Sequence, residues 1–155
     1  MLEGLHYQNA YVCDDIEAGI DLFRGRGLRK DPMIIPVDQE VLTPAGPKRV
    51  ANKICFIWID NLQYELIEVI ADEVGIYDKC LSNGGPLRFH HICMRVPEWE
   101  GFRARVDQQD LPVAMERNVT EGGLRFLYLD GRKVFGHFLE YTYMSDAMWD
   151  QIRAM

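Results

Sequence analysis

Two similar stretches of the chain decide its architecture. Residues 89–100 read FHHICMRVPEWE, and residues 7–17 read YQNAYVCDDIE. Each predicts a strand of alternating side chains, an acidic turn and the start of an amphipathic helix. When the turn residues Glu98 and Asp15 are aligned, His91 falls opposite Gln8. We therefore interpret the chain as two copies of one structural unit.

Each copy also contains a later strand that carries one carboxylate among apolar residues. The first reads QYELI and contains Glu65, and the second reads FLEYT and contains Glu140. A single glutamate in such a strand usually faces solvent. One nitrogen or oxygen donor and one carboxylate at matching positions of both copies, however, favour a metal site with four protein ligands. This pattern predicts an enzyme.

The order of apolar runs and turn residues predicts an α+β fold. The expected parts are a first βαβββ module (5–70), a linker (71–87), a second βαβββ module (88–143) and a C-terminal helix (144–155). We expect the strands of both modules to form one curved mixed sheet around a cavity, with helices on its outer side. The whole chain is then one structural domain.

Several boundaries follow from local signals. The turn Asp60-Asn61 predicts a hairpin within the first module, and Asp130-Gly131-Arg132 predicts one that leads into a strand over 134–143. We expect a helix over 98–109 and only short extended pieces over 32–47. A short helix is also expected near Val74, Tyr77 and Leu81, and Asn83 marks the boundary between the halves.

Composition excludes several classes of function. The chain has 155 residues, a net charge of −7 and a pI near 5.0, which argues against a nucleic-acid partner. It has no apolar run of the roughly 20 residues that span a bilayer and no signal-peptide pattern, so we expect a cytoplasmic protein without a membrane partner. The four cysteines lack metal-binding spacing and are expected to be reduced.

Strand alternation predicts which side chains share a face. Gln8 shares its face with His6, and His91 shares its face with Arg95, which either binds a substrate carboxylate or phosphate or lies solvated at the rim. Tyr7 and His90 are expected to point the opposite way. The residues expected to make the cavity apolar are Val12, Ile67 and Phe138, with Trp58 nearby.

The motifs HHI-x-M-x-V-P-E-W-E, Y-E-L-I-E and G-H-F-L-E-Y, in a duplicated βαβββ frame, resemble the vicinal oxygen chelate superfamily. This group includes glyoxalase I, methylmalonyl-CoA epimerase, extradiol dioxygenases and bleomycin-resistance proteins. The resemblance covers about residues 5–143. Residues 70–91 look most like the glyoxalase and epimerase branch.

The resemblance implies that one divalent ion (zinc, nickel, cobalt, manganese or iron) is bound by Gln8, Glu65, His91 and Glu140. Both first-strand ligands are often histidine in the family, and here the first is glutamine. One imidazole and three oxygens favour an ion with open water positions over a closed tetrahedral zinc site. His6 is the alternative to Gln8 as a ligand.

The activity that the resemblance implies is proton abstraction next to the carbonyl of a small chelating substrate, by an isomerase, epimerase or lyase. Glu140 is the expected general base, and Glu65 serves the opposite face. An extradiol-type dioxygenase is an alternative, but it needs a second histidine from His6 or His90. A metal-free small-molecule binding or resistance protein is another alternative. The family also implies a homodimer.

Overall fold

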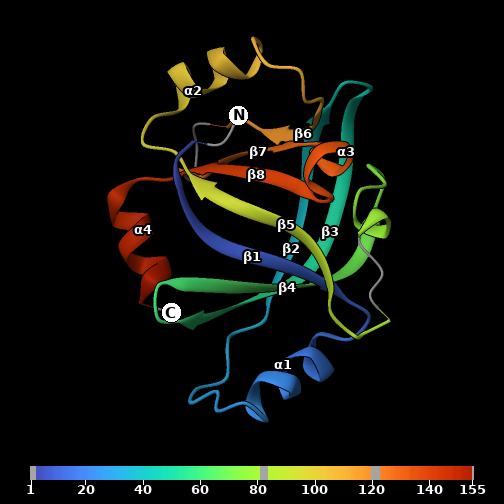
Figure 1. Cartoon of the computed structure of the whole chain (residues 1–155), viewed down its shortest axis with the longest axis vertical. Helices are drawn as coiled ribbons and strands as arrows, with labels where there is room; N and C mark the ends of the chain where they lie inside the picture. The colour runs from blue at the N-terminus through green and yellow to red at the C-terminus, as the bar shows by residue number, and fades with distance from the viewer. Residues whose placement is uncertain (1–2, 81–83, 120–122, 155) are drawn as a thin grey trace.

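Eight strands close into one barrel in the computed structural model, which describes residues 3–80, 84–119 and 123–154 (Figure 1). The first half contains β1 (Leu5–Cys13), α1 (Ile16–Arg24), β2 (Ile35–Thr43), β3 (Gly46–Ile59) and β4 (Leu62–Asp72). The 3-10 turn η1 (Tyr77–Lys79) follows. The second half contains β5 (Arg88–Arg95), α2 (Trp99–Val106), β6 (Val113–Arg117), β7 (Arg125–Leu129), α3 (Arg132–Phe135), β8 (Phe138–Tyr143) and the C-terminal α4 (Asp146–Arg153).

The two halves are arranged in the same way. The strand order around the barrel is β1-β4-β3-β2-β6-β7-β8-β5, so each module contributes the same sequence of neighbours and the modules join through β1–β5 and β2–β6. Asp15 caps α1 and Glu98 caps α2, each through its side-chain carboxylate. The predicted α+β fold with a curved mixed sheet is confirmed, and the sheet goes further than expected by closing on itself.

Apolar side chains form clusters inside the barrel and attach a helix to each side of it. α1 packs through Ile16 and Ile20 against the outer face of the first half, and α2 packs through Phe102 and Val106 against the second half. The two helices lie at opposite ends of the molecule in Figure 1. Phe102 is fully buried, and loss of such a ring costs roughly 3–5 kcal/mol.

Two β-bulges interrupt the alternation in β1 and β5. The antiparallel register passes from His6 to Gln8 in β1, and it skips one residue of β5 between His91 and Phe89. Tyr7 and His90 are the extra residues, and a bulge lets two consecutive side chains turn toward the same side. Tyr7, Gln8, His90 and His91 are accordingly all buried. Tyr7 lines the cavity inside the barrel and His90 contacts the His91 ring, so the prediction that they point the opposite way from Gln8 and His91 is wrong.

Some boundaries also differ from the prediction. The strand expected over 134–143 begins only at Phe138, because residues 132–135 form α3. The Asp130 carboxylate accepts from the Arg132 backbone and guanidinium, and Gly136 ends the helix with a φ of 82°.

The remaining boundaries differ less. The predicted hairpin turn at Asp60 is confirmed, with Asp60 at a φ of 54°. Residues 35–43 form one strand, not short pieces, because β2 pairs with β3 along its whole length. Helix α2 is shorter than the expected 98–109. Leu81, predicted to belong to a short helix, and Asn83, predicted to mark the boundary between the halves, lie outside the described residues.

All four cysteines are free, as predicted. In the described part of the chain, no helix is long and apolar enough to cross a membrane.

Candidate metal centre

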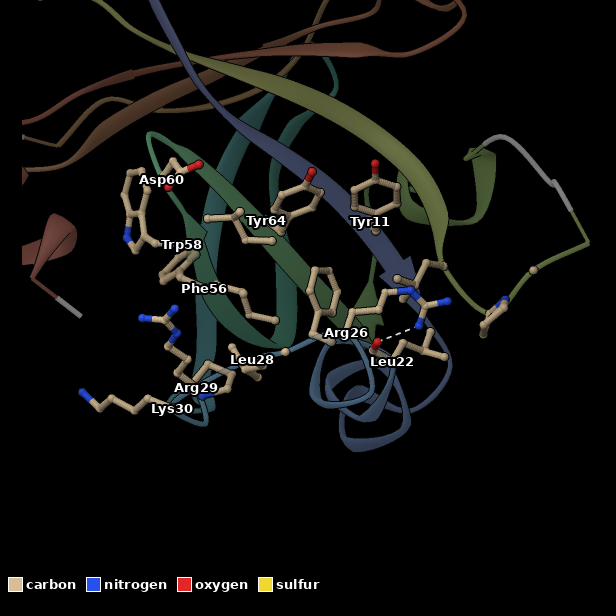
Figure 2. Close-up of a pocket in the computed structure, with 18 residues that line it drawn as sticks. Tyr11, Leu22, Arg26, Leu28, Arg29, Lys30, Phe56, Trp58, Asp60 and Tyr64 are labelled. Atoms are coloured by element: carbon tan, nitrogen blue, oxygen red, sulfur yellow. Dashed lines mark hydrogen bonds between the residues drawn. The ribbon is translucent and has the colours of Figure 1, made fainter.

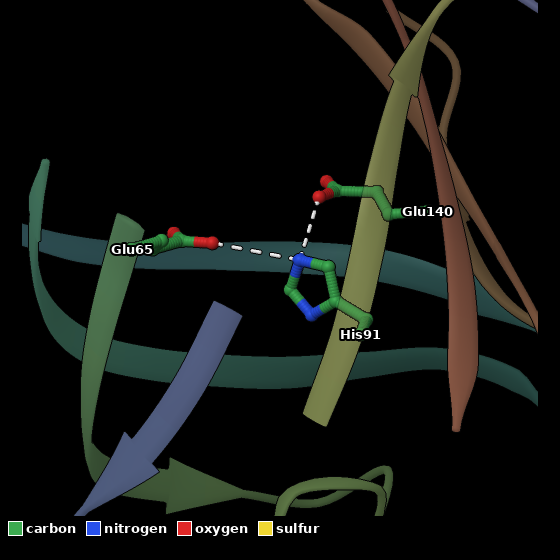
Figure 3. A group of neighbouring side chains, drawn as sticks. All are labelled: Glu65, His91 and Glu140. Carbon is green, nitrogen blue, oxygen red and sulfur yellow. Dashed lines mark ion pairs between the residues drawn. The ribbon is translucent and has the colours of Figure 1, made fainter. Parts of the chain in front are cut away.

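Three of the predicted ligands meet inside the barrel. Glu65 on β4, His91 on β5 and Glu140 on β8 each offer an atom, and these atoms all lie within 4.8 Å of one another. His91 Nε2 is 2.9 Å from Glu140 Oε2 and 3.5 Å from Glu65 Oε2. Figure 3 shows the two carboxylates reaching the same imidazole nitrogen from different strands. His91 is fully buried, and both glutamates are 8% exposed.

The strand register explains why these residues meet. In the parallel pair β1–β4, Ala10 lies opposite Glu65, and in the parallel pair β5–β8, Cys93 lies opposite Glu140. Each carboxylate is therefore placed two residues along from Gln8 or His91 on the neighbouring strand. The alignment of the two sequence copies corresponds to one spatial arrangement that occurs twice.

His90 fixes the orientation of His91. His90 Nε2 lies 3.2 Å from the Ile76 carbonyl oxygen, which can only accept, so His90 Nε2 carries a proton. Burial is the main cause that holds the pKa of His90 well below its usual value, so His90 is neutral and its Nδ1 accepts. The 2.8 Å contact between the two Nδ1 atoms is then donated by His91.

This tautomer has a consequence at the other ring nitrogen. Because His91 donates its Nδ1 proton to His90, its other ring nitrogen, Nε2, is the one that faces Glu65 and Glu140. A lone pair and a carboxylate oxygen at 2.9 Å repel each other unless a proton or a cation lies between them. A histidine that ligates a metal commonly donates its other N–H to a neighbour, and His90 is that neighbour here.

The two carboxylates are costly without a cation. The pKa of Glu65 is raised well above its usual value, first by burial and then by the negative charge of Glu140. The phenol of Tyr128 lies 3.5 Å from His91 Nε2, and burial also raises its pKa. A divalent ion among these groups would offset both the burial and the repulsion.

The fourth predicted ligand, Gln8, lines the same cavity and is held by Gln63. Its Nε2 donates to Gln63 Oε1 at 2.6 Å, while Gln8 Oε1 is buried without a hydrogen-bond partner. A buried, unsatisfied carbonyl oxygen is unfavourable, and a cation would satisfy it. The donor set therefore fits a hard divalent ion. His6 does not join it, because the bulge leaves its side chain exposed and bonded to Asn9.

The site opens into a cavity of about 320 Å³ inside the barrel. Ile67 lines it as expected, whereas Val12 and Phe138 pack in the surrounding core and Trp58 lines a different cavity. α4 contributes Ile152 to the wall. Among the described residues, Arg117 is the one lysine or arginine in the lining.

Sequence reasoning missed several residues of this site. The orientation of His90 and Tyr7 depends on the two bulges, which no residue pattern in the sequence predicts. Gln63, which orients Gln8, lies two residues before Glu65 in the same strand and was not expected to take part in the site. Arg95, considered as an anion ligand, instead bonds to Asp146 and lies over the Trp149 ring, so it attaches α4 to β5. The signal that could have revealed Arg117 as a cavity residue is its position in β6, a strand of the second module.

Comparisons with known proteins find the fold but no close relative in sequence. No family model matches the chain, and no curated protein matches it. The hypothetical protein BH1468 from Bacillus halodurans C-125 has a TM-score of 0.61 and 17% identity, covering 91% of this chain and 94% of that chain.

Two methylmalonyl-CoA epimerases are also similar in structure. The Streptomyces coelicolor enzyme, a variant in complex with 2-nitronate-propionyl-CoA, has a TM-score of 0.58 and 15% identity over 92% of this chain and 98% of that chain. The Mycobacterium tuberculosis enzyme has a TM-score of 0.58 and 15% identity over 97% of each chain. The chain thus has the vicinal oxygen chelate fold that its motifs predicted.

Proposed function

We propose that this protein is a metal-dependent isomerase or epimerase that moves a proton on the carbon next to a substrate carbonyl. The observation that carries the proposal is the convergence of two buried carboxylates on the Nε2 atom of His91. A cation of one divalent metal would be held by His91 Nε2, the carboxylates of Glu65 and Glu140, and Gln8 Oε1. Bound there, it supplies Lewis acidity to a chelated carbonyl.

The chain's own residues supply the proton chemistry. Glu140 and Glu65 come from opposite modules and reach His91 from different sides (Figure 3). One carboxylate, in its ionised form, can take the proton from one face of the substrate, and the other, in its protonated form, can return a proton to the opposite face; proton exchange with water then restores both groups. We assign the first role to Glu140. His90 keeps the His91 ring in place through the contact between the two Nδ1 atoms.

The cavity favours a small substrate with an anionic group. Arg117 lies in the wall beside Ile67 and Phe126, so a carboxylate on an otherwise apolar compound is complemented there. Similar solved structures contain epimerases bound to 2-nitronate-propionyl-CoA and methylmalonyl-CoA. An acyl thioester that carries a carboxylate is therefore the substrate class that we propose to test first.

The alternatives are less well supported. An extradiol dioxygenase needs two imidazoles at the metal, but His90 is turned to His91 and the Ile76 carbonyl, and His6 is exposed. His137 bonds its own strand at the Phe138 carbonyl. A metal-free binding protein gains nothing from two buried carboxylates. The homodimer stays a prediction, which sedimentation velocity would test.

The Glu140→Gln variant tests the proposed chemistry. It keeps an oxygen donor and the side-chain shape but cannot take a proton. We expect the variant to retain metal by elemental analysis, while exchange of the substrate α-proton with deuterated solvent falls by about 10²-fold or more. The matched control is Glu116→Gln, which changes a buried carboxylate that pairs with Arg103 outside the cavity.

Two results would contradict the proposal. One is wild-type protein that holds no stoichiometric metal and binds none when it is added. The other is a Glu140→Gln variant that holds metal and exchanges the α-proton at the wild-type rate, which would remove Glu140 from the role of base.

A further inference from the structure

A second, larger cavity lies outside the barrel. Its volume is about 920 Å³, and it is bounded by the segment after α1, the hairpin of β3 and β4, and residues 85–87 (Figure 2). Glu65, His91 and Glu140 are not in its lining, and Phe56 is the residue that lines both cavities. A volume of about 300–1,000 Å³ is typical of a site for a small-molecule ligand.

Unpaired positive charge gathers at this cavity. Most arginines of the described chain form ion pairs with carboxylates, as Arg24, Arg49 and Arg88 do. Arg26, Arg29 and Lys30 line the cavity and have no such partner among the described residues, and Arg26 bonds only the Leu22 carbonyl. Figure 2 shows Arg29 and Lys30 below Phe56, with Arg26 on the other side of the cavity, where it is bonded to the Leu22 carbonyl.

A group of positive side chains is unusual for this protein, which is negatively charged as a whole. The chain has a net charge of −7, yet three cations and a single acid, Asp60, face this cavity. Arg29 and Lys30 are adjacent in the chain, so their positive charges repel each other, and an anion with more than one charge relieves that repulsion. Arginine and lysine side chains are the usual ligands of phosphate groups.

The opposite wall is aromatic. The rings of Tyr11 and Tyr64 are almost parallel, with an interplanar angle of 15° and centroids 6.2 Å apart, and Phe23 packs edge-on to Tyr64 at 5.4 Å. Phe56 and Trp58 continue the aromatic lining. Flat rings bind to such surfaces by stacking, with little dependence on their substituents.

We propose that this outer cavity binds a nucleoside diphosphate, with its base against the aromatic wall and its two phosphates against Arg29 and Lys30. A planar ring joined to adjacent negative charges is the ligand that complements both walls together. The site does not depend on the metal centre, because the two linings have only Phe56 in common.

ADP titration of the full-length protein tests the proposal, with calorimetry and the fluorescence of Trp58, which lines the cavity, as readouts. The double variant Arg29→Glu/Lys30→Glu changes two exposed side chains, so folding should be kept. We expect its Kd for ADP to rise by about tenfold or more, because attraction to phosphate becomes repulsion. The matched control, Lys48→Glu/Lys133→Glu, makes the same charge change outside the cavity and should leave the Kd within about twofold.

Two further probes separate the walls. Adenosine lacks the phosphates and inorganic pyrophosphate lacks the ring, so each should bind more weakly than ADP. The proposal is overturned if ADP shows no binding at about 1 mM, if the control variant weakens binding as much as the cavity variant, or if pyrophosphate binds as tightly as ADP. Metal content should be the same in all variants, which keeps this test separate from that of the proposed catalytic site.

Discussion

The two modules present their site residues on the same backbone and differ in how they hold them. Both have a bulge in the first strand, and both place a carboxylate two residues along on the parallel neighbour. In the first module, an amide, Gln63, orients the amide of Gln8. In the second, an imidazole, His90, orients the imidazole of His91. The two halves therefore share the positions of their site residues, while the side chains decide what each half contributes.

Because of this difference, we expect the two halves to contribute unequally to the affinity for a metal ion. The nitrogen of His91 is a strong donor whose tautomer is fixed by a chain of contacts ending at the Ile76 carbonyl. The oxygen of Gln8 is a neutral, weaker donor. Gln63 lies two positions before the carboxylate of its module. In the second half, the matching position is occupied by the apolar Phe138. Variants that treat the two halves alike should therefore have unequal effects.

The largest effect is expected from His91→Ala. It removes the only imidazole whose nitrogen faces both carboxylates, so metal affinity should fall by about 10³-fold or more, whereas Gln8→Ala should cost much less. Calorimetric titration of each variant with zinc or manganese measures the two losses. If Gln8→Ala lost more affinity than His91→Ala, the comparison of the modules would be wrong.

A smaller effect is expected from His90→Phe. The phenyl ring can keep the stacking on Tyr77 and Phe138, but it cannot accept the His91 Nδ1 proton. Metal affinity should fall by about 10–100-fold, the usual cost of losing a hydrogen-bond partner behind a ligand. The same metal titration measures the loss.

Two further variants serve as comparisons for His90→Phe. His137→Phe, at a histidine outside the site, should leave the affinity unchanged. Gln63→Leu, which frees Gln8, should cost less than His90→Phe, since an amide oxygen needs less orientation than a ring nitrogen. Equal losses for Gln63→Leu and His90→Phe would show that the two halves are alike in this respect. Thermal unfolding of each variant separates loss of affinity from loss of folding.

The smallest effect concerns how the modules attach their first helices. Glu68 accepts from the backbone N–H of Ile16 at the start of α1 and from Lys53, whereas Tyr143 occupies the matching position in the second half. The bonds from Lys53 and then Ile16 lower the pKa of Glu68. A lowered pKa means that Glu68 stabilises the fold above its unfolded-state pKa, near 4.5, and that this contribution is lost as the pH falls through the folded value.

Glu68→Gln should therefore lower Tm at pH 7 by a few degrees, and the difference from wild type should disappear in acid, well below pH about 4. Scanning calorimetry across this range measures it. Glu40→Gln, at an exposed acid of β2, is the control and should follow the wild type at every pH. A difference that persists unchanged in acid would exclude the ionised carboxylate as its cause.

The sequence predicted those features whose signals lie close together along the chain. The acidic turns at Asp15 and Glu98 and the hairpin turn at Asp60 were predicted because each signal acts within a few residues of itself. The strand expected from residue 134 was wrong because Asp130 and Gly136 stabilise a helical turn whose contacts the apolar pattern does not contain. The partner of Arg95 could not be predicted, because Asp146 lies 51 residues away in the sequence.

The sequence by itself determined the duplication, the fold class and the identity of four candidate ligands, because repeated patterns and residue types are written along one chain. Tertiary structure alone decided that Glu65 and Glu140 reach one nitrogen of His91, that bulges turn His90 toward it, and that an aromatic and cationic cavity forms outside the barrel. These features depend on the register between strands far apart in sequence. A shift of one residue in that register would turn each side chain to the other face, and no local pattern specifies it.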